Sequence, residues 1–153
     1  MTVEITKAWV YKGRHCIILW VGSHYCGYGE TKLKCGYSHT ATGLEYDGTS
    51  PESCVTAHGG LTFSGPLDIT PFDKDIYYFG MDYAHAGDYM EYDCVSLREG
   101  KKWTIEEVEK DVEAMIDSII EYEQKYVKIR ELFEEYKNKI KILLEEIKND
   151  THT

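Results

Sequence analysis

The chain has 153 residues, 42% of them hydrophobic, and a formal net charge of -10. This length suits a single domain that buries a sizeable core without metals or disulfides to hold it together. Acidic residues outnumber basic ones both before and after Gly100, and no patch rich in lysine and arginine is present. We therefore exclude duplex nucleic acid as a partner, because neutralising its phosphates requires such a patch.

Nothing in the sequence predicts membrane insertion or export. No stretch approaches the roughly 18 uninterrupted apolar residues of a membrane span, and the polar start lacks the charged and apolar regions of a signal peptide. The five cysteines form an odd number without a Cys-x-x-Cys pair, which in a reducing compartment favours thiols over disulfides. We expect a soluble, cytoplasmic protein.

The composition changes at Gly100. All 13 glycines and all 3 prolines lie in residues 1–100, where β-branched and aromatic runs alternate with turn signals, as in an antiparallel sheet. The sequence predicts an α+β fold, with a β-rich ligand-binding head over 1–100 and a C-terminal helical segment for docking and oligomerisation over 101–153. The predicted strands are 8–11 and 16–21, joined by a turn at Lys12-Gly13, then 54–57, 61–63, 76–82 and 92–97, with a loop over 31–52.

A long helix is predicted after Trp103. Thr104-Ile105-Glu106-Glu107 has the form of a capping box, which satisfies the first free amides of a helix. Apolar residues then recur at alternating spacings of three and four, a heptad pattern typical of coiled coils: Ile105, Val108, Val112, Met115, Ile119, Tyr122, Tyr126, Ile129, Phe133, Tyr136, Ile140, Leu143 and Ile147.

Two arrangements fit this pattern. One is a continuous helix over 105–149, whose first half docks on the head while its second half forms a homo-oligomer. The other is a helical hairpin that folds back near Gln124-Lys125. We favour the continuous helix, because that dipeptide lacks turn residues.

Four residues of the head are of the types that bind divalent metals in phosphoesterases: His58, Asp82, His85 and Asp88. However, Asp82-x-x-His85-x-x-Asp88 lacks the i, i+4 spacing of a helical metal pair. Aspartate and histidine in glycine-rich turns also commonly satisfy backbone amides. We therefore expect no catalytic residue, no metal and no cofactor, and keep a metal-dependent phosphodiesterase as the alternative.

Aromatic residues flank these glycine-rich segments, and flat rings beside exposed amides suit a nucleobase and its phosphate. Strand neighbours point to opposite faces, so about half of these rings belong to the core instead. The sequence predicts a nucleotide pocket formed by His24, Tyr25, Tyr28, His58, Gly59, Gly60, Thr62, Ser64, Phe79, Asp82, Tyr83, His85 and Asp88.

Four blocks carry a resemblance to a known family: HCIIL at 15–19, GSHYCGY at 22–28, HGGLTFSG at 58–65 and FGMDYAHAGD at 79–88. In this order they resemble the signature blocks of a widespread family of small phage and prophage proteins. That family is similar to viral sponge proteins, which sequester nucleotide second messengers of bacterial defence systems such as CBASS, Thoeris and type III CRISPR.

The resemblance implies an anti-defence protein in the host cytosol that binds a cyclic or signalling nucleotide without cleaving it and forms a homo-oligomer. The alternatives are a phosphodiesterase that degrades such a messenger, and an inhibitor that contacts a host defence enzyme directly. The segment between the second and third blocks departs from the family and carries Lys34-Cys35-Gly36-Tyr37.

Overall fold

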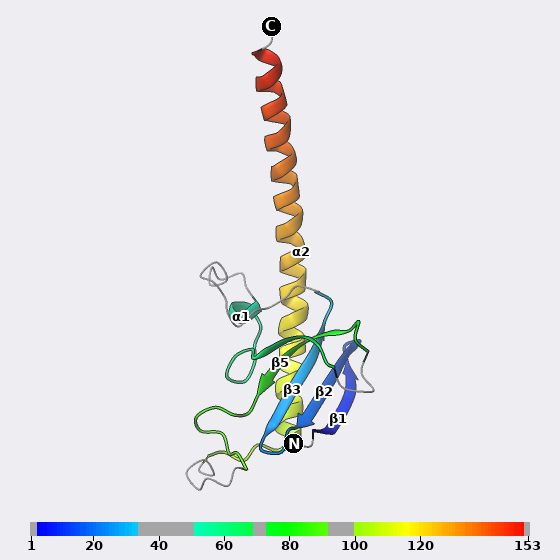
Figure 1. Cartoon of the computed structure of the whole chain (residues 1–153), viewed down its shortest axis with the longest axis vertical. Helices are drawn as coiled ribbons and strands as arrows, with labels where there is room; N and C mark the ends of the chain where they lie inside the picture. The colour runs from blue at the N-terminus through cyan, green and yellow to red at the C-terminus, as the bar shows by residue number, and fades with distance from the viewer. Residues whose placement is uncertain (1–2, 34–50, 69–72, 92–99, 152–153) are drawn as a thin grey trace. The chain divides into compact units, whose positions relative to one another are not determined.

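A computed structural model describes residues 3–33, 51–68, 73–91 and 100–151. Five strands form one antiparallel sheet of order β1-β2-β3-β5-β4, followed by one long helix (Figure 1). The elements are β1 Glu4–Tyr11, β2 Arg14–Trp20, β3 Tyr25–Thr31, α1 Pro51–Cys54, β4 Phe63–Pro66, β5 Tyr77–Asp82 and α2 Ile105–Asp150. The predicted α+β fold is therefore confirmed. Within the described ranges, no helix combines the length and apolarity that crossing a membrane would need.

The hairpin of β1 and β2 turns where the sequence predicts it. Lys12 and Gly13 both have positive φ, 48° and 74°, as a two-residue turn that follows the twist of its strands requires. The strand predicted at 76–82 is also present, as β5.

Three local predictions need correction. Residues 25–31 form β3, which the prediction omits because its glycines resemble a turn. The strand predicted at 54–57 is wrong, since Cys54 ends α1 and no strand follows directly. The strand predicted at 61–63 begins only at Phe63. The strand predicted at 92–97 lies outside the described residues, as does most of the loop predicted at 31–52.

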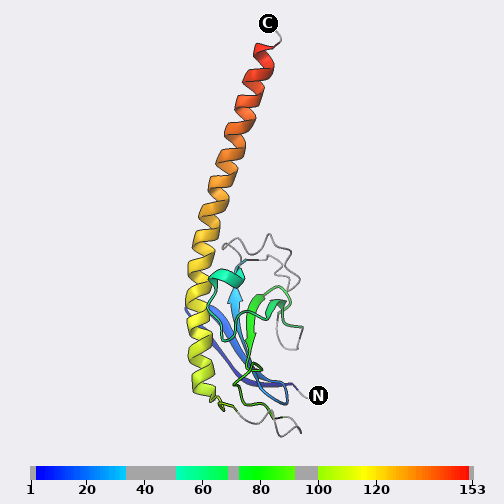
Figure 2. The ribbon, with the colours of Figure 1, turned by 90° about the vertical axis from the view of Figure 1, so that its left-hand side faces the viewer.

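The first part of α2 packs on one face of the sheet (Figure 2). Val108, Val112, Met115, Ile116 and Ile119 are fully buried, and the capping box closes with a 3.2 Å hydrogen bond from the Glu107 amide to Thr104 Oγ1. The glycines of β3 allow this close approach: a Cβ on Gly27 would lie 2.7 Å from Val112, and one on Gly29 would lie 2.7 Å from Ile116.

The edge strand β1 is tied to the same helix by polar contacts. Alternate residues of a strand share a face, and residues four apart share a helix face, so three strand residues meet three helix residues in turn. These contacts are Lys7 Nζ to Glu109 at 2.6 Å, Trp9 Nε1 to Glu113 at 3.3 Å and Tyr11 OH to Asp117 at 3.2 Å.

The opposite face of the sheet has its own apolar cluster, built by Ile17, Leu19, Leu67 and Tyr78 with partly buried neighbours that include Tyr28 and Phe63. Tyr28 packs edge to face on Phe63, with ring centroids 5.4 Å apart. Both faces of the sheet are therefore covered over its centre.

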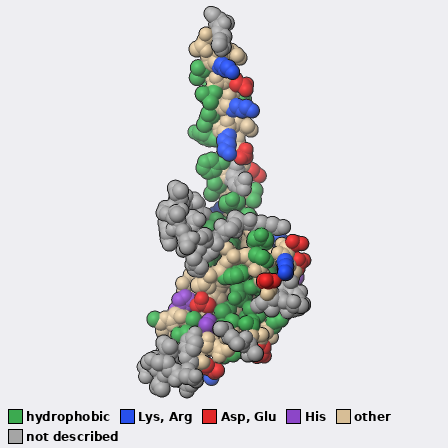
Figure 3. All heavy atoms as spheres, in the orientation of Figure 1, with side chains coloured by type: hydrophobic (Ala, Val, Ile, Leu, Met, Phe, Trp, Pro, Cys, Tyr) green, Lys and Arg blue, Asp and Glu red, His purple; other side chains and the backbone are tan. Residues whose placement is uncertain are grey.

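The chain divides into two compact units, Met1–Tyr122 and Glu123–Thr153. α2 is one uninterrupted helix of 46 residues, so the continuous helix is confirmed over the hairpin. In the second unit most of the exposed apolar side chains follow one side of the helix (Figure 3).

Candidate functional site

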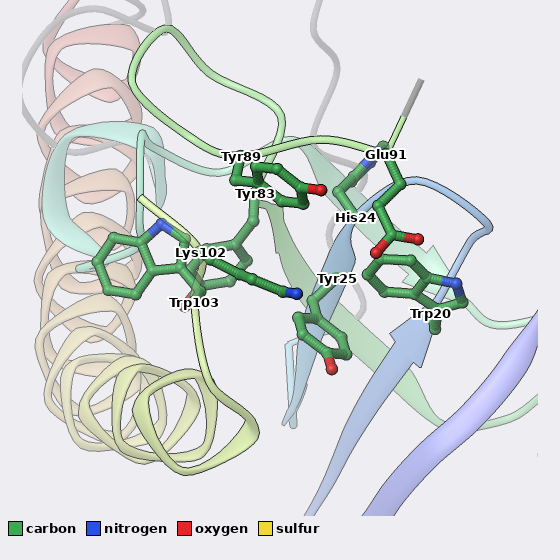
Figure 4. Close-up of a pocket in the computed structure, with 8 residues that line it drawn as sticks. All are labelled: Trp20, His24, Tyr25, Tyr83, Tyr89, Glu91, Lys102 and Trp103. Atoms are coloured by element: carbon green, nitrogen blue, oxygen red, sulfur yellow. The ribbon is translucent and has the colours of Figure 1, made fainter. Parts of the chain in front are cut away.

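An aromatic pocket lies in the first unit, at the end of the sheet face that α2 covers. Three segments line it: the end of β2 and the start of β3, the residues after β5, and the residues just before α2 (Figure 4). Its volume is about 290 Å³. The lining residues are Trp20, His24, Tyr25, Tyr83, Tyr89, Glu91, Lys102 and Trp103.

The aromatic walls of this pocket support one another. Trp20 and Tyr25 pack edge to face with centroids 4.9 Å apart, and Tyr83 and Trp103 do so at 5.3 Å. The phenol of Tyr83 is further fixed by a 2.6 Å hydrogen bond to Asp111 on α2. Burial and this hydrogen bond raise the pKa of Tyr83, so the phenol stays protonated at neutral pH.

Two opposite charges are placed among the rings. Lys102 extends into the pocket with its ammonium 5.4 Å from the centre of the Tyr89 ring, and Glu91 lies on the far side (Figure 4). Burial lowers the pKa of His24, whose Nδ1 lies 2.7 Å from Ser23 Oγ, so its imidazole is neutral at pH 7. The pocket thus offers one cation, one anion and several flat apolar surfaces.

The entry of the chain into α2 is held against the loop after β5. The Lys101 amide donates to the Gly87 carbonyl at 2.8 Å, and the Tyr89 amide donates to the Lys101 carbonyl at 2.9 Å. A side chain at Gly100 would collide with the backbone of Asp88, since its Cβ would lie 2.6 Å from that carbonyl carbon. This contact brings Trp103 and Tyr89 to the same pocket.

A polar cluster of His58, His85 and Asp88 lies directly behind the pocket. The Asp88 carboxylate is 5% exposed and accepts hydrogen bonds from His58 Nε2 at 2.9 Å, the His85 amide at 3.0 Å and Trp103 Nε1 at 2.8 Å. Burial opposes ionisation of this carboxyl, but the three donors outweigh burial and lower its pKa. Asp88 is therefore a charged, buried anchor.

The two histidines of the cluster differ in their partners. The His58 ring stacks on Tyr83 at 4.2 Å, which joins the cluster to the pocket wall. His85 Nδ1 is buried without a hydrogen bond, 3.4 Å from Asp88 Oδ2 and 3.7 Å from Asp82 Oδ1. The His85 ring also fills the space over Gly59, where a Cβ would lie 2.3 Å from His85 Cε1.

This cluster contains the residue types that hold metals. One ligand atom from each of His58, His85 and Asp88 lies within 4.8 Å of the others. Two imidazoles and a carboxylate suit first-row transition metals such as zinc.

The structure groups the predicted site residues in three ways. His24, Tyr25 and Tyr83 line the pocket. His58, Gly59, Asp82, His85 and Asp88 lie at the cluster behind it. The remaining predicted residues, Tyr28, Gly60, Thr62, Ser64 and Phe79, line neither.

Two of these remaining residues lie in the core. Phe79 is fully buried on the face of the sheet toward α2, and Tyr28 packs into the cluster on the opposite face, so both belong to the core. The prediction also omits five lining residues: Trp20, Tyr89, Glu91, Lys102 and Trp103. For Trp103 the available signal was a large aromatic beside two lysines directly before a helix cap.

Comparisons with models of protein families, with curated proteins and with solved structures found no match to this chain.

Proposed function

We propose that the chain binds a signalling nucleotide in the aromatic pocket and sequesters it intact. The observation that carries this proposal is the convergence of five aromatic rings around Lys102 and Glu91. Each nucleobase has a flat π-face that stacks on aromatic side chains, and stacking of this kind is worth about 1–3 kcal/mol per base. Lys102 suits a phosphate, while Glu91 suits an amino group of the base or a sugar hydroxyl.

The size of the pocket sets the part of the ligand that it holds. Its volume of about 290 Å³ falls at the lower end of the range for small-molecule sites. We infer that it receives one base with its sugar, so the rest of a larger messenger extends beyond it. A pocket for one base fits a cyclic nucleotide, because each nucleotide of such a ligand presents one base.

The chemistry of the lining favours binding over cleavage. Apart from tyrosine phenols, the eight lining residues offer no hydroxyl or thiol nucleophile, and they contain a single carboxylate. Burial raises the pKa of both Tyr25 and Tyr83, which makes their phenols still poorer nucleophiles at neutral pH. The resemblance to phage proteins extends the proposal to a viral role in evading nucleotide-based host defence.

We further propose that the second half of α2 associates with copies of itself. From Ile129 onward, the residues of the heptad seam are 39% to 69% exposed: Ile129, Phe133, Tyr136, Ile140, Leu143 and Ile147. Leu132 and Leu144 flank the seam and widen it. If each of these eight side chains buries on the order of 100 Å² on association, the total matches the roughly 800 Å² that each partner buries in a standard interface.

A second copy is the occupant that fits this seam, because two identical heptad patterns are complementary to each other. Two ion pairs in this part of the chain, Lys137 with Glu134 and Lys139 with Glu135, join residues of the same helix. None of the residues of the seam is charged.

The test of ligand binding is to incubate the protein with a panel of cyclic and linear nucleotides, remove unbound ligand, denature the protein and analyse what is released. Sequestration predicts stoichiometric return of intact ligand. Trp20→Ala and Lys102→Ala should each weaken binding at least tenfold by calorimetry. Trp9→Ala and Lys12→Ala, which change the same residue types outside the pocket, should leave affinity unchanged.

Other outcomes would support the alternatives. Turnover that a chelator abolishes would indicate a metal-dependent phosphodiesterase at His58, His85 and Asp88. Failure to bind any nucleotide, together with inhibition of a purified defence enzyme, would indicate direct protein inhibition.

A further inference from the structure

We propose that His58, His85 and Asp88 form a binding site for a divalent transition-metal ion of the zinc type. The sequence alone does not favour this site, because Asp82-x-x-His85-x-x-Asp88 lacks the i, i+4 spacing of a helical metal pair. The fold brings the His58 loop and the loop after β5 together, so that a ring nitrogen of each histidine faces the same carboxylate. The proposal does not depend on nucleotide binding.

The separation between His85 and Asp88 matches that of two ligands around one ion. Two ligands bound to zinc at about 2.0–2.1 Å with a tetrahedral angle are about 3.3 Å apart. His85 Nδ1 lies 3.4 Å from Asp88 Oδ2, which is longer than a good hydrogen bond, and His58 Nε2 lies 2.9 Å from the same oxygen. A small outward shift of His58 would accommodate the ion.

The second observation is that His85 Nδ1 has no hydrogen-bond partner. Its Nδ1 is buried and makes no hydrogen bond, although buried polar atoms in proteins are nearly always paired. It lies 3.4 Å from a carboxylate oxygen of Asp88 and 3.7 Å from one of Asp82. A cation held between Nδ1 and Asp88 would satisfy this nitrogen.

The surroundings resemble those of a built metal site. Asp88 accepts from Trp103 Nε1 and from the His85 amide, and hydrogen bonds of this kind orient a ligating carboxylate. Gly59 leaves the space that the His85 ring occupies. Three protein ligands would leave a fourth position for water or another small ligand.

The test is calorimetric titration of the full-length, chelator-treated protein with zinc chloride in the absence of nucleotide. We expect one ion per chain, and at least a tenfold loss of affinity in His85→Gln and in Asp88→Asn. The matched control is His15→Gln, an exposed histidine on β2 whose loss should leave zinc affinity unchanged. Circular dichroism confirms that each variant is folded.

Titration with cobalt distinguishes metal binding at this site from metal binding at the cysteines. Binding at two imidazoles and a carboxylate should give visible d–d bands without a thiolate charge-transfer band, and His85→Gln should remove the bands. A thiolate band, zinc affinity that is equal in His85→Gln and the native chain, or no zinc binding at all would overturn the proposal. The last outcome would leave the cluster as a hydrogen-bonded histidine–aspartate group only.

Discussion

Substitution of Gly59 by alanine should displace His85 and thereby break the polar cluster. Gly59 has a φ of 66°, in the left-handed region, and that conformation costs an L-residue about 1–2 kcal/mol. The added Cβ would also lie 2.3 Å from Cε1 of His85. Because His85 is one-third exposed, its ring can swing toward solvent, at the loss of its contacts with Asp88 and His58.

The neighbouring glycine provides the control. Gly60 has a φ of 92°, and a Cβ there would meet no atom within 4 Å. Gly60→Ala should therefore cost only the backbone strain of about 1–2 kcal/mol. Gly59→Ala should cost up to about 1 kcal/mol more, the upper value for a partly exposed ion pair.

The assay combines urea unfolding with NMR of the histidine ring nitrogens. We expect the His85 signals to move in Gly59→Ala and to stay in place in Gly60→Ala, with both variants folded. Unchanged His85 signals in Gly59→Ala would refute the reasoning, since the ring could then not occupy the space over this glycine.

Three further predictions concern other parts of the chain. Light scattering should find an oligomer for the full-length chain and a smaller species for a chain ending at Glu123; a monomeric full-length chain would contradict the self-association of α2. Burial raises the pKa of Cys16 to about 12 and that of Cys26 to about 11, so among the three cysteines in the described part of the chain iodoacetamide at neutral pH should modify the exposed Cys54 before the other two. Equal modification of these three would argue against burial of the two strand thiols. Burial opposes ionisation of Glu30, but hydrogen bonds from the His15 amide and from Lys32 lower its pKa below the ordinary 4.5. The stabilisation of the folded protein by ionised Glu30 is therefore complete above about pH 4.5, and it is lost as the pH falls through the lower pKa of Glu30 in the folded state. Glu30→Gln should accordingly flatten the acid side of the stability profile, and an unchanged profile would contradict this.

The parts of the fold with a local signal could be predicted from the sequence. The helix cap at Thr104 and the turn at Lys12-Gly13 depend on residues only a few positions apart, so their patterns are readable without tertiary context. β3 could not be read in this way. Its Gly27 and Gly29 are typical of turns, and only the packing of α2 against them explains their presence in a strand.

The candidate site shows the same limit. The histidine and aspartate blocks draw attention to His58, His85 and Asp88, and the fold brings these three residues together. The sequence marks Trp103 as a large aromatic beside two lysines, but its place in the pocket wall depends on the pairing of Lys101 with residues 87–89, which only the tertiary structure specifies. Phe79 lies in the core, and sequence alone does not indicate which face of a strand meets the core.

The contacts between β1 and α2 have a consequence for biosynthesis. Trp9 and Glu113 are 104 positions apart, and Tyr11 and Asp117 are 106 apart. The ribosome delivers the N-terminal strands well before the helix that covers them, so the covered face, which includes Met81, has no partner on α2 until the buried helix residues, which begin at Val108, have left the exit tunnel. Native contacts of such long range also form slowly. The nascent sheet is therefore most prone to aggregation before α2 has been synthesised. A stalled or truncated chain that ends before α2 should depend on chaperones.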